Sequence, residues 1–219
     1  MQHLTLADEI VVLMLDDSVG EIRPGCMPLA LIAVAGGLLM ELALQGRIDT
    51  DLKALFIVNQ AATGDDLLDA ILQEIAAEPE QHPSAWWIEQ LSTRHDDLVE
   101  LVLARLVAAG ILLEEDFRTL WVFSGRAYPQ ATGREEREAK ARLMSVLFLD
   151  GVPDPRDTLL LGLANSSGAL AAILTEAELE KASGRIAEVA GLEEIARSVG
   201  VVSNPSWDAM ASIMASYAH

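Results

Sequence analysis

The stretch from Pro28 to Gly46 reads PLALIAVAGGLLMELALQG and decides the fold. Proline suits the first turn of a helix and the final glycine suits a left-handed stop, so we expect a helix over Leu29–Gln45. This helix is apolar nearly all round until Glu41, which predicts that it lies at the centre of the molecule. The Gly36-Gly37 pair lowers helix propensity, so it favours close packing against another backbone.

Helical patterns flank this segment on both sides. Thr5 can cap a helix, with Asp8 three residues later, ahead of the apolar run Ile10–Leu15. Thr63-Gly64-Asp65 opens a further helix over Asp66–Ala77, whose leucines and isoleucines follow helical spacing. The remaining patterns predict helices around Trp86–Ile88 and over Asp96–Ala109, Arg134–Leu149, Asp157–Ala164, Ala169–Leu174, Glu176–Val189, Leu192–Val199 and Ser206–His219.

Two segments are rich in β-forming residues instead. We expect a short hairpin between Arg47 and Gln60. A second hairpin is expected after Gly110, with strands at Ile111–Leu113 and Thr119–Phe123 and a charged turn at Glu114–Asp116. If its second strand projects from the body, an exposed apolar patch marks an interface; if the strand folds back, the same residues belong to the core. The patch consists of Leu120, Trp121, Val122 and Phe123.

These patterns predict a mainly α fold. We expect a single-domain helical bundle over residues 4–217, built around a buried central helix and carrying short β-hairpins. The uncharged run from Pro24 to Met40 contains two prolines and two neighbouring glycines, so we expect a buried core helix and not a membrane span. The first residues lack the positive region of a signal peptide.

Composition narrows the function. The 219 residues include 15 Lys+Arg and 34 Asp+Glu, giving a formal net charge of −19. Such a balance disfavours a nucleic-acid partner, because affinity for phosphate backbones depends on Lys and Arg. The helix and hairpin units are compatible with a winged-helix DNA regulator, but the helix from Asp96 contains only Arg105 as a basic residue, which disfavours that function. The single cysteine, Cys26, favours a reducing cytoplasmic location.

No motif for catalysis is present in the sequence. Gly-x-Ser-x-Gly and the phosphate-binding glycine-rich loop are both absent, and Asn165–Gly168 fits a helix end better than a nucleophile turn. The four histidines do not have zinc spacing with Cys26. We therefore expect a protein that is not an enzyme and that uses no cofactor and no metal.

Anion binding is the one site chemistry that the residues offer. Arg94 and His95 lie just ahead of a helix whose first amides could face a phosphate. Arg134, Arg137 and Lys140 recur at three-residue steps, but glutamates are interleaved, which favours ion pairs within the helix.

Four ordered stretches resemble the family of Golgi phosphoprotein 3 adaptors. They are LTLADE at Leu4–Glu9, ELALQGRI at Glu41–Ile48, ATGDDLLD at Ala62–Asp69 and WIEQLS at Trp87–Ser92. The resemblance implies a non-enzymatic helical protein that binds phosphatidylinositol 4-phosphate and retains client proteins. It also implies that the hairpin after Gly110 serves self-association and membrane contact.

The headgroup site of the family is where this sequence differs. The family has a tryptophan and three arginines at positions held here by Cys26, Ala35, Asp96 and Val99. Arg23, or Arg94 with His95, are the remaining candidates for a phosphoinositide headgroup.

Two hypotheses follow from the sequence. The leading one is a cytoplasmic, peripherally membrane-attached adaptor that binds a phosphoinositide and forms homo-oligomers through Leu120–Phe123. The alternative is a protein-interaction scaffold without lipid binding, which the net charge of −19 favours.

Overall fold

The computed structural model describes residues 4–51, 54–119, 123–149 and 151–198. Within these ranges the chain is mainly helical with small antiparallel sheets, which confirms the predicted fold class. In chain order the elements are α1 (Leu6–Met14), the short 3₁₀ helix η1 (Met27–Leu29), α2 (Ala30–Leu44), β1 (Ile48–Thr50), β2 (Leu55–Ile57), α3 (Asp66–Ala77), α4 (Ser84–Arg94), α5 (Leu98–Ala108), β3 (Glu115–Thr119), β4 (Phe123–Ala127), α6 (Arg134–Phe148), α7 (Pro155–Ser166), α8 (Ala169–Ile173) and α9 (Glu176–Ser198).

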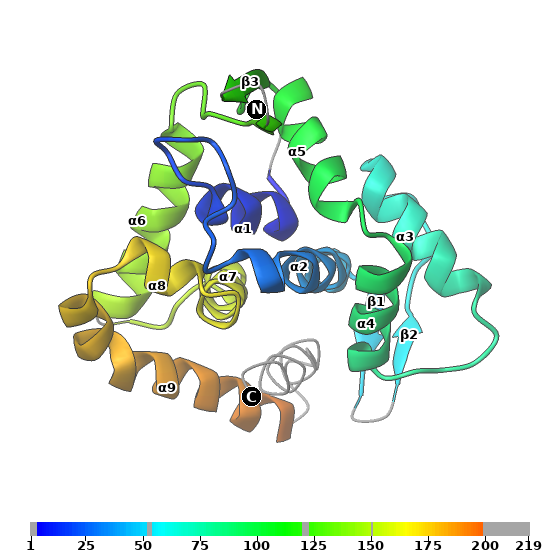
Figure 1. Cartoon of the computed structure of the whole chain (residues 1–219). Helices are drawn as coiled ribbons and strands as arrows, with labels where there is room; N and C mark the ends of the chain where they lie inside the picture. Colours follow the sequence, from blue (N-terminus) through cyan, green and yellow to red (C-terminus); the bar gives the residue numbers. More distant parts are fainter. Residues whose placement is uncertain (1–3, 52–53, 120–122, 150, 199–219) are drawn as a thin grey trace.

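The central position predicted for the apolar helix is confirmed. Figure 1 shows α2 in the middle, with α6 to α9 on one side of it and α3, α4 and the β1–β2 hairpin on the other. By length and composition alone, Met27–Leu44 could cross a membrane, but 67% of that window is buried inside the protein. Gly46, at φ +63°, ends α2 in the left-handed conformation, as predicted.

Helix α1 packs directly on α2 through the predicted glycine contact. A Cβ atom on Gly37 would lie 2.9 Å from the backbone nitrogen of Ala7, so only glycine allows this approach. Every residue of α1 is buried, including Asp8 and Glu9. A buried acidic side chain requires partners, and the partners of Asp8 and Glu9 come from α5, α6 and α7.

Side-chain caps fix the starts of α1 and α3. Thr5 and Asp8 form the predicted reciprocal cap, in which Asp8 N donates to Thr5 Oγ1 at 3.2 Å and Thr5 N donates to Asp8 Oδ2 at 2.8 Å. Asp65 Oδ1 accepts from the backbone amides of Leu67 and Leu68 at 3.1 and 3.0 Å. Each cap therefore holds a carboxylate at one helix start.

The two hairpins were predicted with different success. The first is confirmed, with Ile48 opposite Ile57 in the register of β1 and β2. In the second, Glu115 pairs with Ala127 and Thr119 pairs with Phe123, so the predicted charged turn at Glu114–Asp116 is wrong. That segment contains no Gly, Pro or Asn to fix a turn, and it enters β3 instead.

The end of the described chain also corrects the sequence analysis. Helix α9 runs without interruption through Gly191, where we expected a break. A single glycine costs about 1 kcal/mol inside a helix, which is too little to end it without a further signal. Residues 199–219 lie outside the described residues, so the single domain over 4–217 stays a prediction.

Candidate functional site

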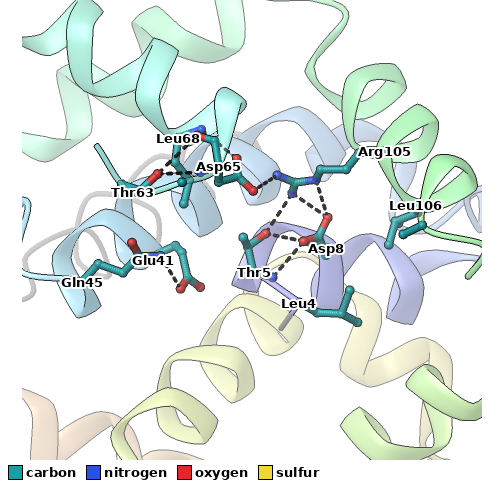
Figure 2. Close-up of a pocket in the computed structure, with 12 residues that line it drawn as sticks. Leu4, Thr5, Asp8, Glu41, Gln45, Thr63, Asp65, Leu68, Arg105 and Leu106 are labelled. Carbon is teal, nitrogen blue, oxygen red and sulfur yellow. Dashed lines mark hydrogen bonds and ion pairs between the residues drawn. The ribbon is translucent and has the colours of Figure 1, made fainter. Parts of the chain in front are cut away.

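A cavity of about 370 Å³ opens where α1, α2, α3 and α5 meet. Its size is within the usual range of small-molecule sites, which is about 300–1,000 Å³. Figure 2 shows side chains from all four regions arranged around it. The polar lining residues are Thr5, Asp8, Glu41, Gln45, Thr63, Asp65 and Arg105, and the apolar ones are Leu4, Leu68, Leu106 and Ala109.

Arg105 of α5 joins two helix starts on one wall of the cavity. Its guanidinium donates to Asp8 Oδ1 from Nε at 3.0 Å and from Nη2 at 2.5 Å. Nη1 donates to Asp65 Oδ2 at 2.7 Å, and Nη2 also reaches Thr5 Oγ1 at 3.0 Å. Figure 2 shows these side chains converging on the guanidinium. One arginine therefore connects α1, α3 and α5.

Glu41 of α2 forms the wall next to Thr5, and its side chain is only 6% exposed. Oε2 accepts the backbone amide of Leu6 at 3.0 Å and pairs with Arg156 Nη1 at 2.9 Å. Oε1 accepts a single hydrogen bond, from Gln45 Nε2 at 3.2 Å. Glu41 thus satisfies a backbone amide at the start of α1 and is itself paired with Arg156.

The lining has an excess of negative charge. Three carboxylates, from Asp8, Glu41 and Asp65, stand against the single guanidinium of Arg105. Arg156 approaches Glu41 but does not line the cavity. Because Arg156 Nη1 lies 2.9 Å from Glu41 Oε2, two guanidinium groups together offset most of the charge of the three carboxylates.

The predicted headgroup residues each have a carboxylate nearby. Arg23 donates to the Leu13 carbonyl oxygen at 2.8 Å and lies 4.0 Å from Asp16. Arg94 Nη1 and His95 Nε2 both contact Glu74, at 3.0 and 2.7 Å. None of the three lines the cavity described above.

Arg94 and His95 both affect the titration of Glu74. Burial raises the pKa of Glu74, but hydrogen bonds from His95 and Arg94 outweigh it, so the pKa lies below the usual value of 4.5. Arg94 also lies over the Trp86 ring, with its guanidinium carbon 5.6 Å from the centroid. Arg94 is therefore already engaged by a carboxylate and an aromatic ring, and His95 by the same carboxylate.

The predicted contact patch falls mainly outside the described residues. Leu120, Trp121 and Val122 lie between β3 and β4 in the sequence and are not described, and Phe123 is the first residue of β4. The base of this hairpin is attached to the body, because Tyr128 N donates to the Gly20 carbonyl at 2.7 Å and Tyr128 Oη contacts Glu100 at 3.0 Å. The role of the patch stays a prediction.

Sequence reasoning missed the cavity residues as a group. Asp8 and Asp65 were recognised only as helix-start residues, and Arg105 only as the single basic residue of its helix. That arginine among apolar neighbours was the available signal, because a charge that packs beside apolar side chains requires a partner. Among the residues that the structure describes, no group of three or more His, Cys, Asp or Glu side chains is placed to hold a metal ion.

Comparison with known protein families gives a match over most of the chain. The family model described as Golgi phosphoprotein 3 (GPP34) matches residues 6–204. The match includes α1, α2, both hairpins and all the polar residues of the cavity except Thr5.

Proposed function

Because the chain belongs to the Golgi phosphoprotein 3 family, we propose that it is a non-enzymatic adaptor that works by binding partner proteins. The family assignment supports the adaptor role in general terms. The choice of protein contact over a lipid headgroup is supported by the residues themselves. We further propose that the adaptor acts in the cytoplasm, where the chain's one cysteine stays reduced.

The observation that carries this proposal is the engagement of Glu74 by both Arg94 and His95. A phosphorylated inositol bound there would have to displace Glu74 or tolerate its negative charge. Arg23 offers no better site, because Asp16 lies beside it. Exposed ion pairs contribute only about 0–1 kcal/mol, so one arginine beside a carboxylate would hold a headgroup weakly.

Phosphoinositide binding at a membrane surface is the second candidate function. The β3–β4 hairpin favours it, because three apolar residues, Leu120, Trp121 and Val122, separate the two strands in the sequence. Residues of this kind can enter the interface of a bilayer. In this alternative the chain is a peripheral membrane protein.

Liposome flotation distinguishes the two candidates. The full chain is mixed at low salt with vesicles that each contain one phosphoinositide, in parallel with Arg23→Ala and Arg94→Ala. The protein-contact proposal expects no flotation of the wild type with any vesicle. Flotation that requires a phosphoinositide and is lost in either variant would establish the lipid function instead.

Affinity capture tests protein contact itself. The immobilised full chain is incubated with a cell lysate, and an unrelated protein of similar net charge serves as the control. We expect proteins that bind the chain and not the control. Identical sets on both would contradict the proposal, because they would reflect charge alone.

Self-association through the hairpin is a separate proposal, and it is tested by Trp121→Ser combined with Phe123→Ser. We expect light scattering to give a lower mass for this variant than for the wild type, because the apolar contact is removed. An unchanged oligomeric mass would exclude the hairpin as the interface.

A further inference from the structure

We propose that Gln130 and the carboxyl groups of Asp17 and Glu136 form a clamp at the base of the β3–β4 hairpin that is stronger in acid. The clamp joins the loop between α1 and α2 to the segment between β4 and α6. It is most stable when Glu136 holds a proton, and it is weaker when both carboxyl groups are charged. The inference concerns the attachment of the hairpin to the body and does not depend on the proposed adaptor function.

The residues just after β4 are held by the α1–α2 loop. Tyr128 N donates to the Gly20 carbonyl oxygen at 2.7 Å. Gly20 has φ +68°, and a Cβ atom at this position would lie 2.6 Å from Pro129 N. Leu113 N, two residues ahead of β3, donates to the Pro129 carbonyl oxygen at 2.8 Å. The loop backbone therefore contacts the segment that leads out of the hairpin, so the stability of this contact sets how firmly the hairpin base is attached.

Gln130 connects the loop to the first turn of α6. Its Nε2 donates to Asp17 Oδ1 at 2.8 Å and to Glu136 Oε2 at 3.0 Å. An amide nitrogen carries two hydrogens, so this single group brings both carboxyl groups to the same place. Gln130 Oε1 is buried and has no hydrogen-bond partner. The Gln130 side chain is therefore held through its nitrogen, and its attachment depends on the state of the two carboxyl groups.

Two carboxylates on one amide repel each other when both are charged. Glu136 is the group that takes up the proton, because it is only 7% exposed whereas Asp17 is exposed to water. Burial and the contact with Asp17 raise the pKa of Glu136 above its usual value of 4.5, and Gln130 and Arg23 oppose this only in part. A protonated Glu136 can donate to the Asp17 carboxylate and still accept from Gln130, so a hydrogen bond replaces the repulsion.

The charged groups around the clamp have contacts of their own. They lie in the α1–α2 loop, on α6, on α1 and near the hairpin base, and their contacts are Asp16 with Arg23, Arg134 with Glu138, Arg137 with the Thr132 carbonyl, Glu135 with the Thr132 hydroxyl, Lys140 with Glu178, Asp8 with Arg105, Glu9 with Arg142, Arg126 with Glu114, and Glu100 with Tyr128. Glu21, also in the loop, is exposed. Arg23 is the cation that acts on Glu136, and Asp16 at 4.0 Å offsets part of its charge.

The pH dependence has a definite sign. Because the folded-state pKa of Glu136 is raised, its contribution to the closed clamp is fully present below pH 4.5 and is lost as the pH rises through the folded pKa. Glu74 has the opposite sign, because its pKa is lowered. The two groups can therefore be distinguished in one protein.

Amide hydrogen exchange of the full chain, followed by NMR between about pH 5 and 8, tests the proposal. This range lies above the isoelectric point of 4.4, so the chain keeps a net charge and stays in solution. The amides of Tyr128 and Leu113 are the reporters, with their rates corrected for the intrinsic pH dependence of exchange. We expect their protection to fall about threefold or more as the pH rises, because one pKa unit corresponds to a factor of ten in an equilibrium. Protection that is constant or increases with pH overturns the proposal.

Glu136→Gln imitates the protonated acid and keeps its hydrogen bonds. We expect the Tyr128 amide of this variant to be protected at every pH as it is in acidic wild type. Glu138→Gln is the matched control, because Glu138 is an exposed glutamate of the same helix, and it should keep the pH dependence of wild type. Persistence of the dependence in Glu136→Gln, or its loss in both variants, would contradict the assignment to Glu136.

Asp17→Asn tests the second carboxyl group at an exposed position, where the substitution does not disturb the core. Asparagine can still accept from Gln130 but does not repel Glu136. We expect a weaker pH dependence and greater protection of Tyr128 at the alkaline end, whereas Glu21→Gln in the same loop should behave as wild type. A dependence in Asp17→Asn equal to that of wild type would mean that burial of Glu136 acts alone, and the shared clamp would be wrong.

Discussion

Two ion-pair clusters of the same size lie on different parts of the molecule. In one, Arg105 is held between Asp8 and Asp65; in the other, Glu74 is held between Arg94 and His95. The Asp8 side chain is 6% exposed, whereas Arg94 is 44% exposed. The first cluster connects three helices, and the second connects only α3 to the end of α4.

The difference shows that the number of ion pairs does not measure their effect on stability. Water solvates the exposed Arg94 side chain and salt screens its charge. Removing Arg94 therefore leaves Glu74 with other partners, including water. Asp8 lies inside the protein, so loss of Arg105 would leave a buried charge with only Thr5 as its partner. An ion pair of the Arg105 cluster therefore stabilises the fold, whereas the Arg94–Glu74 pair contributes little to the free energy of unfolding.

Of the substitutions in the two clusters, Arg105→Met should change the free energy of unfolding most. We expect the free energy of unfolding to fall by about 3 kcal/mol, because an uncompensated carboxylate remains buried. Urea unfolding followed by circular dichroism measures the change. A loss below about 1 kcal/mol, the range of surface ion pairs, would show that the two clusters are energetically alike.

Gly37→Ala tests the packing that brings the Arg105 cluster together. The new methyl group would meet the Ala7 backbone at 2.9 Å and push α1 away from α2. We expect a loss of about 1–3 kcal/mol in thermal or urea unfolding, the usual cost of overpacking.

Gly184→Ala is the matched control in α9, where nothing lies within 4 Å of the added atom. It should be neutral or stabilising by up to about 1 kcal/mol, because alanine favours the helix. Equal destabilisation by both substitutions would contradict the close approach of α1 and α2.

Acid should change the stability contributed by the Glu74 cluster by a smaller amount than these substitutions. The folded-state pKa of Glu74 is lowered, so its contribution to stability is present above the usual value of 4.5 and is lost as the pH falls through the folded pKa. We expect wild type to lose stability below pH 4.5 by up to about 1 kcal/mol more than Glu74→Gln. Parallel stability curves for the two proteins would contradict the assignment.

Arg94→Ala should have the smallest effect. Its guanidinium is exposed and His95 still contacts Glu74, so we expect a change of about 0–1 kcal/mol in urea unfolding. A loss of stability as large as that of Arg105→Met would mean that solvent exposure does not explain the difference in stability contribution between the two clusters.

Local signals made much of the fold predictable. Thr5 with Asp8, Asp65, and the glycine at position 46 each act within a few residues, so the starts of α1 and α3 and the end of α2 were correct. The second hairpin was shifted, because charged residues at 114–116 do not define a turn. Its register depends on pairing with residues that follow Val122.

The candidate site was less predictable than the fold. The types of its residues were visible, but Asp8 and Arg105 are 97 positions apart, and no local pattern pairs them. Their contact follows from the packing of α1 against both α2 and α5. Only Arg105, the one basic residue of a mostly apolar helix, hinted at an acidic partner.

The burial of α1 also determines the order in which the chain can complete its fold during translation. The ribosome makes this helix before the residues that satisfy it: Arg105 follows Asp8 by 97 positions, and Arg156 follows Leu4, whose carbonyl it binds, by 152. The nascent helix can pack on α2 early, but its polar groups do not have all their partners until α7 has emerged. Contacts between such distant residues slow the completion of folding.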